Sequence, residues 1–156
     1  MSHETLVYGL IDGATYKPPV YRRLQEANLA VLAQLPDEDD CPCLTRHMFA
    51  APPPEPRRGT FRSQVIHFGA SMNRLDFDAV PEWIEKFEAL LRQLFWFEAI
   101  AHIWTNYIDG AYQFWWKVDD SVIDSYRSGD PRPSDAWARE DLHLCRFLDG
   151  PPNTAR

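Results

Sequence analysis

Residues 78–118 read DAVPEWIEKFEALLRQLFWFEAIAHIWTNYIDGAYQFWWKV, and this stretch decides the fold. Its first part predicts an amphipathic helix over 80–95, because large apolar residues recur there at helical spacing. The apolar stripe consists of Val80, Ile84, Phe87, Leu91 and Leu94, widened by Trp83, Leu90 and Phe95. Such a stripe has to be buried against another layer of the protein.

The second part of this stretch predicts a β-hairpin. Asp109-Gly110 is typical of a two-residue type I′ turn, which would place Trp104 opposite Trp115. Paired residues share a face of the sheet. The predicted core face carries Ala101, Ile103, Thr105, Tyr107, Tyr112, Phe114, Trp116 and Val118. The opposite face carries His102, Trp104, Asn106, Gln113, Trp115 and Lys117.

The rest of the chain predicts further elements around this core. Strands are expected over 4–11 and 61–71, and helices over 20–35, 121–127 and 135–148. Apolar residues on both faces of the first strand favour a central place in the sheet. Within it, Gly9 marks a bulge or a close backbone approach, and Asp12-Gly13 predicts a turn after it.

This order of elements predicts one α+β domain over 1–150. We expect a two-layer sandwich, with a mainly antiparallel sheet of about four strands and helices packed on one face. Residues 36–60 are rich in proline and acidic residues and are read as a long irregular excursion, and 151–156 as a tail.

Charge and composition exclude several classes of function. The formal net charge of −7 over 156 residues argues against direct binding of nucleic acid or a membrane surface. The start of the chain does not resemble a signal peptide, and the most apolar run, 94–104, is too short to span a bilayer. Three cysteines form no disulfide framework, so a reduced, cytoplasmic setting is expected.

Two polar clusters have alternative readings. One cluster has the residue types that bind zinc: Cys41, Cys43 and His47, with His143 and Cys145 far along the chain. It lacks the Cys-x-x-Cys knuckle of zinc sites, so neither a metal nor another cofactor is expected. The acidic run is either a solvated loop or a surface for a basic partner, since it lacks the glycine and ligand alternation of a calcium loop. It consists of Asp37, Glu38, Asp39 and Asp40.

His67 and Ser71 invite comparison with a catalytic triad. The nucleophile-elbow pattern Gly-x-Ser-x-Gly is absent, because Gly69-Ala70-Ser71 continues into Met72. No catalytic residue is therefore expected. A small-molecule-binding or enzymatic α+β domain with a His67/Ser71 pocket stays open as the alternative function.

The Trp104–Trp115 face is the stronger candidate for a functional surface. Aromatic side chains ringed by Asn, Gln, His and Lys are typical of a protein-binding surface. Alternatively, a C-terminal helix covers this face through Trp137, or the face joins two copies in a homodimer.

Three segments together resemble a known family. They are His67-Phe68-Gly69-Ala70-Ser71, residues 83–91 and the aromatic hairpin, and they resemble immunity protein family fifty-two of bacterial polymorphic-toxin systems. The resemblance covers most of residues 4–118. It implies an α+β fold and a small, non-enzymatic cytoplasmic protein that binds and neutralises a cognate toxin. The implied partner is a basic nuclease effector delivered by a type VI secretion system.

Overall fold

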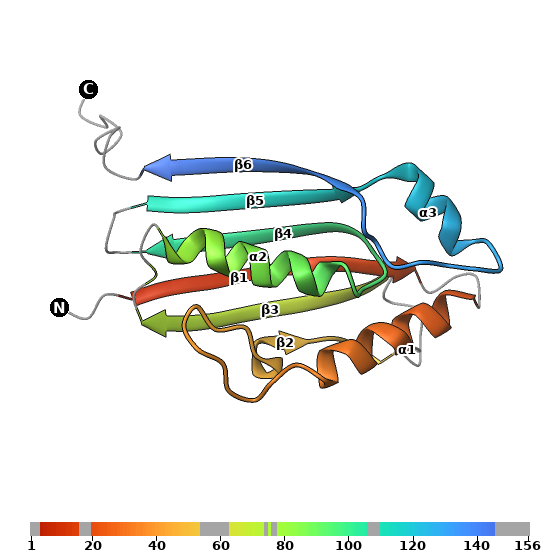
Figure 1. Ribbon diagram of the computed structural model, residues 1–156, viewed down its shortest axis with the longest axis horizontal. Coiled ribbons are helices and arrows are strands. Elements are labelled where there is room, and N and C mark those ends of the chain that lie inside the picture. Colours follow the sequence, from red (N-terminus) through yellow and green to blue (C-terminus); the bar gives the residue numbers. More distant parts are fainter. Residues whose placement is uncertain are drawn as a thin grey trace, which may run out of the picture.

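A computed structural model describes residues 4–15, 20–53, 63–73, 75, 78–105 and 110–145 (Figure 1). The α+β class predicted from the sequence is confirmed. The elements are β1 (Glu4–Thr15), α1 (Val20–Ala33), a 3₁₀ turn η1 (Arg46–Met48), β2 (Phe49–Ala50), β3 (Ser63–Asn73), α2 (Ala79–Leu91), β4 (Trp96–Thr105), β5 (Gly110–Val118), α3 (Asp120–Tyr126) and β6 (Trp137–Cys145). Within the excursion expected over 36–60, η1 and β2 are regular, and 54–60 lie outside the described residues, as does the tail 151–156.

The described strands form one antiparallel sheet in the order β2-β3-β1-β4-β5-β6. It has six strands where about four were expected. β1 lies in its interior, between β3 and β4, as the apolar residues on both its faces predicted. The turn predicted at Asp12-Gly13 is wrong. The strand continues to Thr15, and its register against both neighbours shifts after Asp12.

β6 replaces the helix expected over 135–148. It pairs with β5 along its whole length, from Val118 opposite Trp137 to Gly110 opposite Cys145. The helical prediction is wrong because it considered only local spacing. The edge of β5 offers a full row of backbone hydrogen-bonding partners, and such a tertiary contact overrides a weak local preference.

The β4–β5 register differs from the expected one, but its faces do not. Trp104 lies opposite Ala111 and Trp115 opposite Ile100, so each residue pairs four positions away from its predicted partner. Gly110 belongs to β5 and pairs with Thr105, which rules out the two-residue turn; the connection, 106–109, lies outside the described residues. Four is an even number, so every described side chain keeps its predicted face.

Packing explains the observed register. Phe114 and Trp116 lie opposite Ala101 and Ala99, two small residues that leave room for the large rings beneath the helices. In the predicted register they would face Thr105 and Ile103. Large-against-small pairing fills the layer without overpacking, and this outweighs the preference of a short turn.

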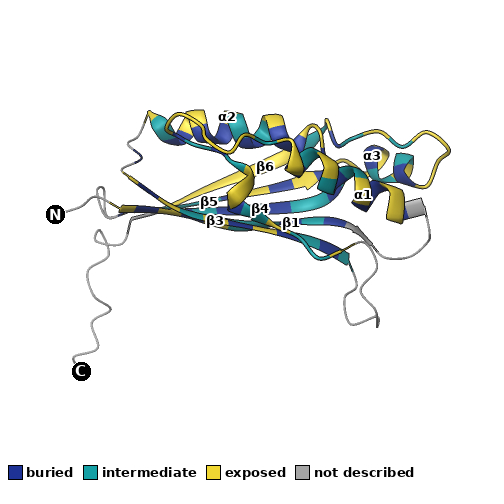
Figure 2. Ribbon diagram, turned by 90° about the horizontal axis from the view of Figure 1, so that it is seen from below, coloured by how far each residue is buried: buried dark blue, intermediate teal, exposed yellow. Residues whose placement is uncertain are grey.

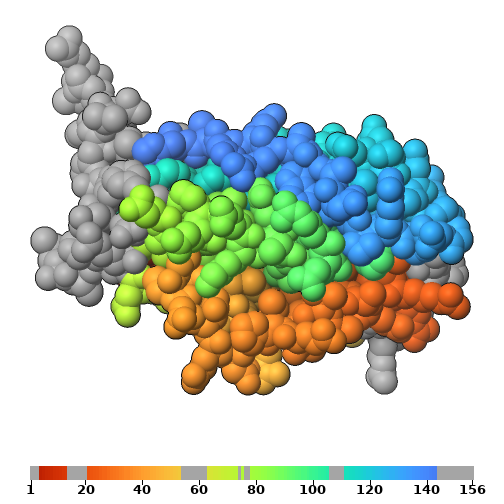
Figure 3. All heavy atoms as spheres, in the orientation of Figure 1, coloured from red at the N-terminus to blue at the C-terminus, as the bar shows by residue number. Residues whose placement is uncertain are grey.

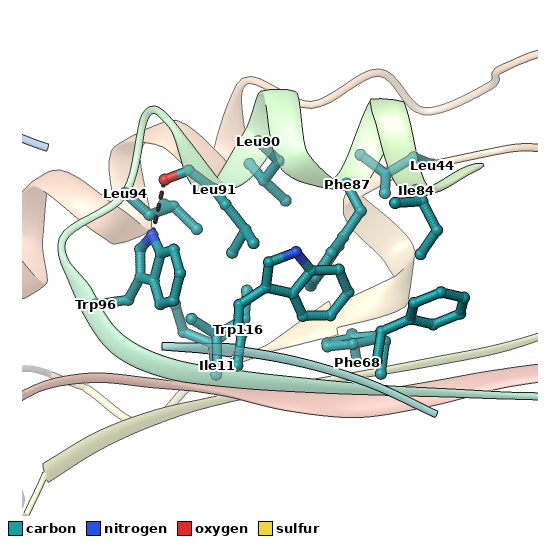
Figure 4. Close-up of a cluster of buried hydrophobic side chains, with 14 of the residues drawn as sticks. Ile11, Leu44, Phe68, Ile84, Phe87, Leu90, Leu91, Leu94, Trp96 and Trp116 are labelled. Atoms are coloured by element: carbon teal, nitrogen blue, oxygen red, sulfur yellow. Dashed lines mark hydrogen bonds between the residues drawn. The ribbon is translucent and has the colours of Figure 1, made fainter. Parts of the chain in front are cut away.

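All three described helices lie on one side of the sheet (Figure 2). The stripe predicted for α2 is buried against β3 and β5, with Phe87 at its centre (Figure 4). The ring of Phe87 lies 5.0 Å from each of the rings of Phe68, Trp83 and Trp116, measured between centroids.

Polar contacts fix the end of α2. The indole Nε1 of Trp96 donates a hydrogen bond to the carbonyl of Leu91 at 2.8 Å (Figure 4). Asn28 on α1 accepts from the amide of Phe95 and donates to its carbonyl, both at 2.8 Å. The first bond is made to a carbonyl of the last turn of α2, and the other two hold the backbone of Phe95 in the connection between α2 and β4.

Gly9 marks a close approach of two backbones, one of the alternatives predicted. A Cβ placed there would lie 2.0 Å from the carbonyl oxygen of Ile100 and 2.6 Å from the ring of Phe68. At Gly69, opposite Tyr8, a Cβ would meet only ordinary contacts, the nearest at 3.6 Å.

Replacing Gly9 by alanine should therefore destabilise the fold, because the β1–β4 backbones would have to separate. We expect Gly9→Ala to lower the free energy of unfolding by roughly 3 kcal/mol. Gly69→Ala, the matched control, should change it by less than about 0.5 kcal/mol. Urea denaturation measures both values, and equal losses in the two variants would contradict the close approach.

Trp96→Phe should cost more stability than Trp83→Phe. Both indoles are fully buried, but the Nε1 of Trp83 has no hydrogen-bond partner among the described residues, whereas Trp96 donates to Leu91. The Leu91 carbonyl would keep its bond from the Leu94 amide but lose this buried indole bond, which adds about 1 kcal/mol to the loss of ring volume common to both. Thermal and urea unfolding of the two variants test this ranking.

Candidate functional site

The face of the sheet opposite the helices is the candidate site, and we call it the open face (Figure 2). None of the described helices covers it. Side chains alternate along each strand, so Thr5 and Val7 of β1 enter the core while Leu6 and Tyr8 point to the open face.

Large exposed apolar side chains gather on this face. Among the described residues, four large hydrophobic side chains are exposed: Leu6 (37%), Tyr8 (50%), Trp115 (40%) and Leu142 (51%). Strand alternation and register place all four on the open face, on β1, β5 and β6. Scattered exposed hydrophobics need no explanation, but their concentration on one face of the sheet indicates an interaction surface.

Polar and aromatic side chains alternate across the open face in rows. One row runs from Tyr8 to His102, Gln113 and Leu142 on neighbouring strands. The rings of Tyr8 and His102 stack, with centroids 5.0 Å apart and planes 17° apart. The side chains of this row therefore form a continuous surface across four strands.

The residues predicted for the functional face of the hairpin lie here, except Asn106, which lies outside the described residues. His102, Trp104 and Gln113 are half-buried, and Trp115 and Lys117 are exposed. The predicted cross-strand tryptophan pair is wrong. Trp104 lies opposite Ala111, and Trp115 is four residues further along β5. The two tryptophan positions are therefore about 13 Å apart along the strand direction.

Sequence reasoning missed three of the four exposed large apolar side chains of the open face: Leu6, Tyr8 and Leu142. The alternation of β1 contained a signal for the first two, but apolar residues on both its faces were taken to mean burial on both. Leu142 was hidden by the helical reading of its segment. The predicted cover is also wrong, because Trp137 packs on the helical side, with its ring 5.8 Å from that of Trp96 and the Arg92 guanidinium 4.9 Å from its ring.

The acidic run does not join the open face. Its side chains are exposed, but two of them bind the protein's own residues. Asp37 forms an ion pair with Arg46, and its carboxylate also lies 3.1 Å from Nε2 of His47. Asp39 accepts hydrogen bonds from Lys86 of α2 at 2.8 Å and from a loop amide, that of Leu44, at 2.9 Å. The remaining carboxylates are Glu38 and Asp40, whose backbone carbonyl also accepts from Lys86.

His67 and Ser71 lie on the open face but not at one site. His67 borders a shallow depression of about 360 Å³, lined also by Tyr8, Leu10, Ile100 and His102. Ser71, four residues further along β3, is outside that lining, and its Oγ donates to Glu4 at 2.8 Å. No histidine–serine pair is formed.

The cysteines also lie apart from the open face. Cys41 is exposed and Cys43 half-buried, and neither forms a disulfide. His143 stacks on Tyr112 on the helical side of the sheet, with ring centroids 4.3 Å apart. Among the described residues, no three His, Cys, Asp or Glu side chains come together in a way that could hold a metal ion. The described helices include none with the length and apolarity needed to cross a membrane.

Comparisons with family models, with curated proteins and with solved structures gave no match for this chain.

Because of the Asp39–Lys86 ion pair, the free energy of unfolding should fall as the pH is lowered into the acid range. The hydrogen bond from Lys86 lowers the pKa of Asp39 below its ordinary value of 3.8, supported by the Leu44 amide. A lowered folded-state pKa contributes stability above the ordinary pKa, and this is lost as pH falls through the folded-state pKa. We expect Asp39→Asn to destabilise the protein at pH 7 by about 1 kcal/mol.

The same variant should lose less stability than the wild type between pH 5 and pH 2. Glu38→Gln is the matched control, because Glu38 has no ion-pair partner among the described residues. Urea midpoints across this range measure the effect. If the urea midpoints of Asp39→Asn and of the wild type fall in parallel, the ion pair is not the cause of the acid-dependent loss of stability.

Proposed function

We propose that this protein is an immunity protein that binds a cognate bacterial toxin through the open face and neutralises it by occlusion. The observation that carries the proposal is the gathering of Leu6, Tyr8, Trp115 and Leu142 on one uncovered face. No catalytic role is assigned to any residue, and the protein acts in the cytoplasm, where the toxin would otherwise act.

The composition of the open face suits protein recognition. Tryptophan and tyrosine are the residues that most often dominate binding energy at interfaces, and Trp115 and Tyr8 are both accessible. Apolar positions lie beside polar groups that can form directional hydrogen bonds, among them His102 and Gln113. A strand-built surface is also rigid, which reduces the entropy lost on binding.

Charge favours a basic partner. The open face carries Asp12, Glu98 and Glu140, and among its described residues Lys117, which lies opposite Glu98, is the only lysine or arginine. The formal net charge of the chain is −7. A nuclease needs a basic cleft for its substrate, so an acidic inhibitor would approach it quickly and compete with nucleic acid.

The identity of the partner rests on the resemblance to polymorphic-toxin immunity proteins in residues 67–71 and 83–91 and in the hairpin. It leads us to propose a type VI secretion effector, with the toxin gene next to the gene for this protein. The alternative, a small-molecule site at His67, has one observation in its favour, the depression between His67 and the Tyr8–His102 stack.

Co-expression with the neighbouring gene product tests the proposal. We expect the cells to survive the toxin only when this protein is present, and the two proteins to co-purify. Failure of both results would refute the immunity function. A homodimer formed through the open face, detected by light scattering and broken by Trp115→Ala, would instead assign this face to self-association.

Trp115→Ala and Leu142→Ala should each weaken toxin binding at least tenfold, since truncating a central interface side chain typically costs about 1.4 kcal/mol or more. Neither should lower stability much, because both side chains are exposed. Arg23→Ala, an exposed change on α1 in the helical layer, is the control. Unchanged affinity in both open-face variants, measured by calorimetry, would remove this face from the interface.

A further inference from the structure

A groove lies on the helical side of the sheet, next to the edge strand β6. It has a volume of about 460 Å³ and runs between α2 and β6, which lie side by side in Figure 3. α2 lies over β1 and β4, so the helix-facing side of β5 and β6 beside it is left as the floor (Figure 1). Ligand sites for small molecules typically enclose about 300–1,000 Å³.

The floor of this groove is aromatic and its helix wall is aliphatic. Tyr112 and Phe114 stand side by side on β5, with ring centroids 6.3 Å apart and planes 12° apart. Val80 and Ile84 of α2 face them across the groove. The imidazole of His143 stacks on Tyr112 in the same floor, with ring centroids 4.3 Å apart, and these side chains together bound an apolar space for a ring or a short alkyl chain.

One end of the groove is closed by a fixed polar network. Oε1 of Glu88 accepts from the indole Nε1 of Trp116 at 2.9 Å and from Nη1 of Arg139 at 2.7 Å. Nε of Arg139 is 2.8 Å from Oδ1 of Asp141. No lysine and no arginine other than Arg139 lines the groove among the described residues, and Arg139 is held between two carboxylates of the protein itself.

Glu85 remains as an unneutralised acid on the groove wall. It lies one helical turn before Glu88, is exposed, and has no ion-pair partner among the described residues. Three carboxylates, one guanidinium and the imidazole of His143 line the groove, so the carboxylates outnumber the arginine beside the apolar space.

We propose that the groove between α2 and β6 binds a compact aromatic or alkyl molecule that carries one protonated amine. Its apolar part lies on Tyr112 and Phe114, and its ammonium group pairs with Glu85. The groove opens on the helical side of the sheet, and it meets the open face only at Leu142 of the edge strand β6, which lines both. The enclosed space suits a small molecule and would admit only a few side chains of a peptide.

Phenethylamine is a suitable probe, and 2-phenylethanol is its neutral counterpart of nearly the same size. Titration followed by ¹H–¹⁵N NMR reports on the groove directly, because the indole N–H of Trp116 is hydrogen-bonded to Glu88 at its inner end. We expect phenethylamine to shift this signal and those of the Tyr112 and Phe114 amides, and to bind at least fivefold more tightly than 2-phenylethanol.

Glu85→Gln separates charge recognition from apolar binding. It should weaken phenethylamine binding about threefold to fivefold, as expected for an exposed ion pair, and leave 2-phenylethanol unchanged. Glu82→Gln is the matched control, because Glu82 is exposed on the same helix but does not line the groove. Equal binding of the two probes, equal effects of the two variants, or shifts outside the groove would each overturn the proposal.

Discussion

The contact between Phe87 and the two aromatic residues beside it, Phe68 and Trp116, is the interaction on which the rest of the structure depends. Phe68 belongs to β3 and Trp116 to β5, and the two strands are separated by β1 and β4. A single helical side chain therefore spans the middle of the sheet. Its burial fixes where α2 lies, and thus which side of the sheet becomes the core.

Both candidate sites follow from this placement. Because the helices are concentrated on one side, every second residue of the long strands faces away from them, and Leu6, Tyr8, Trp115 and Leu142 are left without a cover of described helix. Because α2 is centred over the interior strands, the outer pair β5 and β6 is left partly bare on the helical side. The first surface is broad and suits a protein, whereas the second is narrow and suits a small ligand.

The sequence was sufficient for features that depend on local periodicity. The stripe of α2, the interior place of β1 and the two faces of the hairpin could all be predicted from residue spacing. Features that depend on contacts between distant segments could not. The register of β4 against β5 is set by rings packing over Ala99 and Ala101, and β6 exists because β5 offers an edge. The groove lies between α2 and β6, two segments far apart in the sequence, so no local sequence pattern predicts it.

The position of β1 has a consequence for synthesis. This strand is made before the other described strands, and its two neighbours, β3 and β4, end only at Asn73 and Thr105. At translation rates of about 5–20 residues per second, β1 waits roughly 5–20 s for its second partner. During that time its apolar residues on both faces have no complete sheet to enter, and pairings of such long sequence separation form slowly. Nascent chains of this protein should therefore depend on chaperones until β4 has left the ribosome.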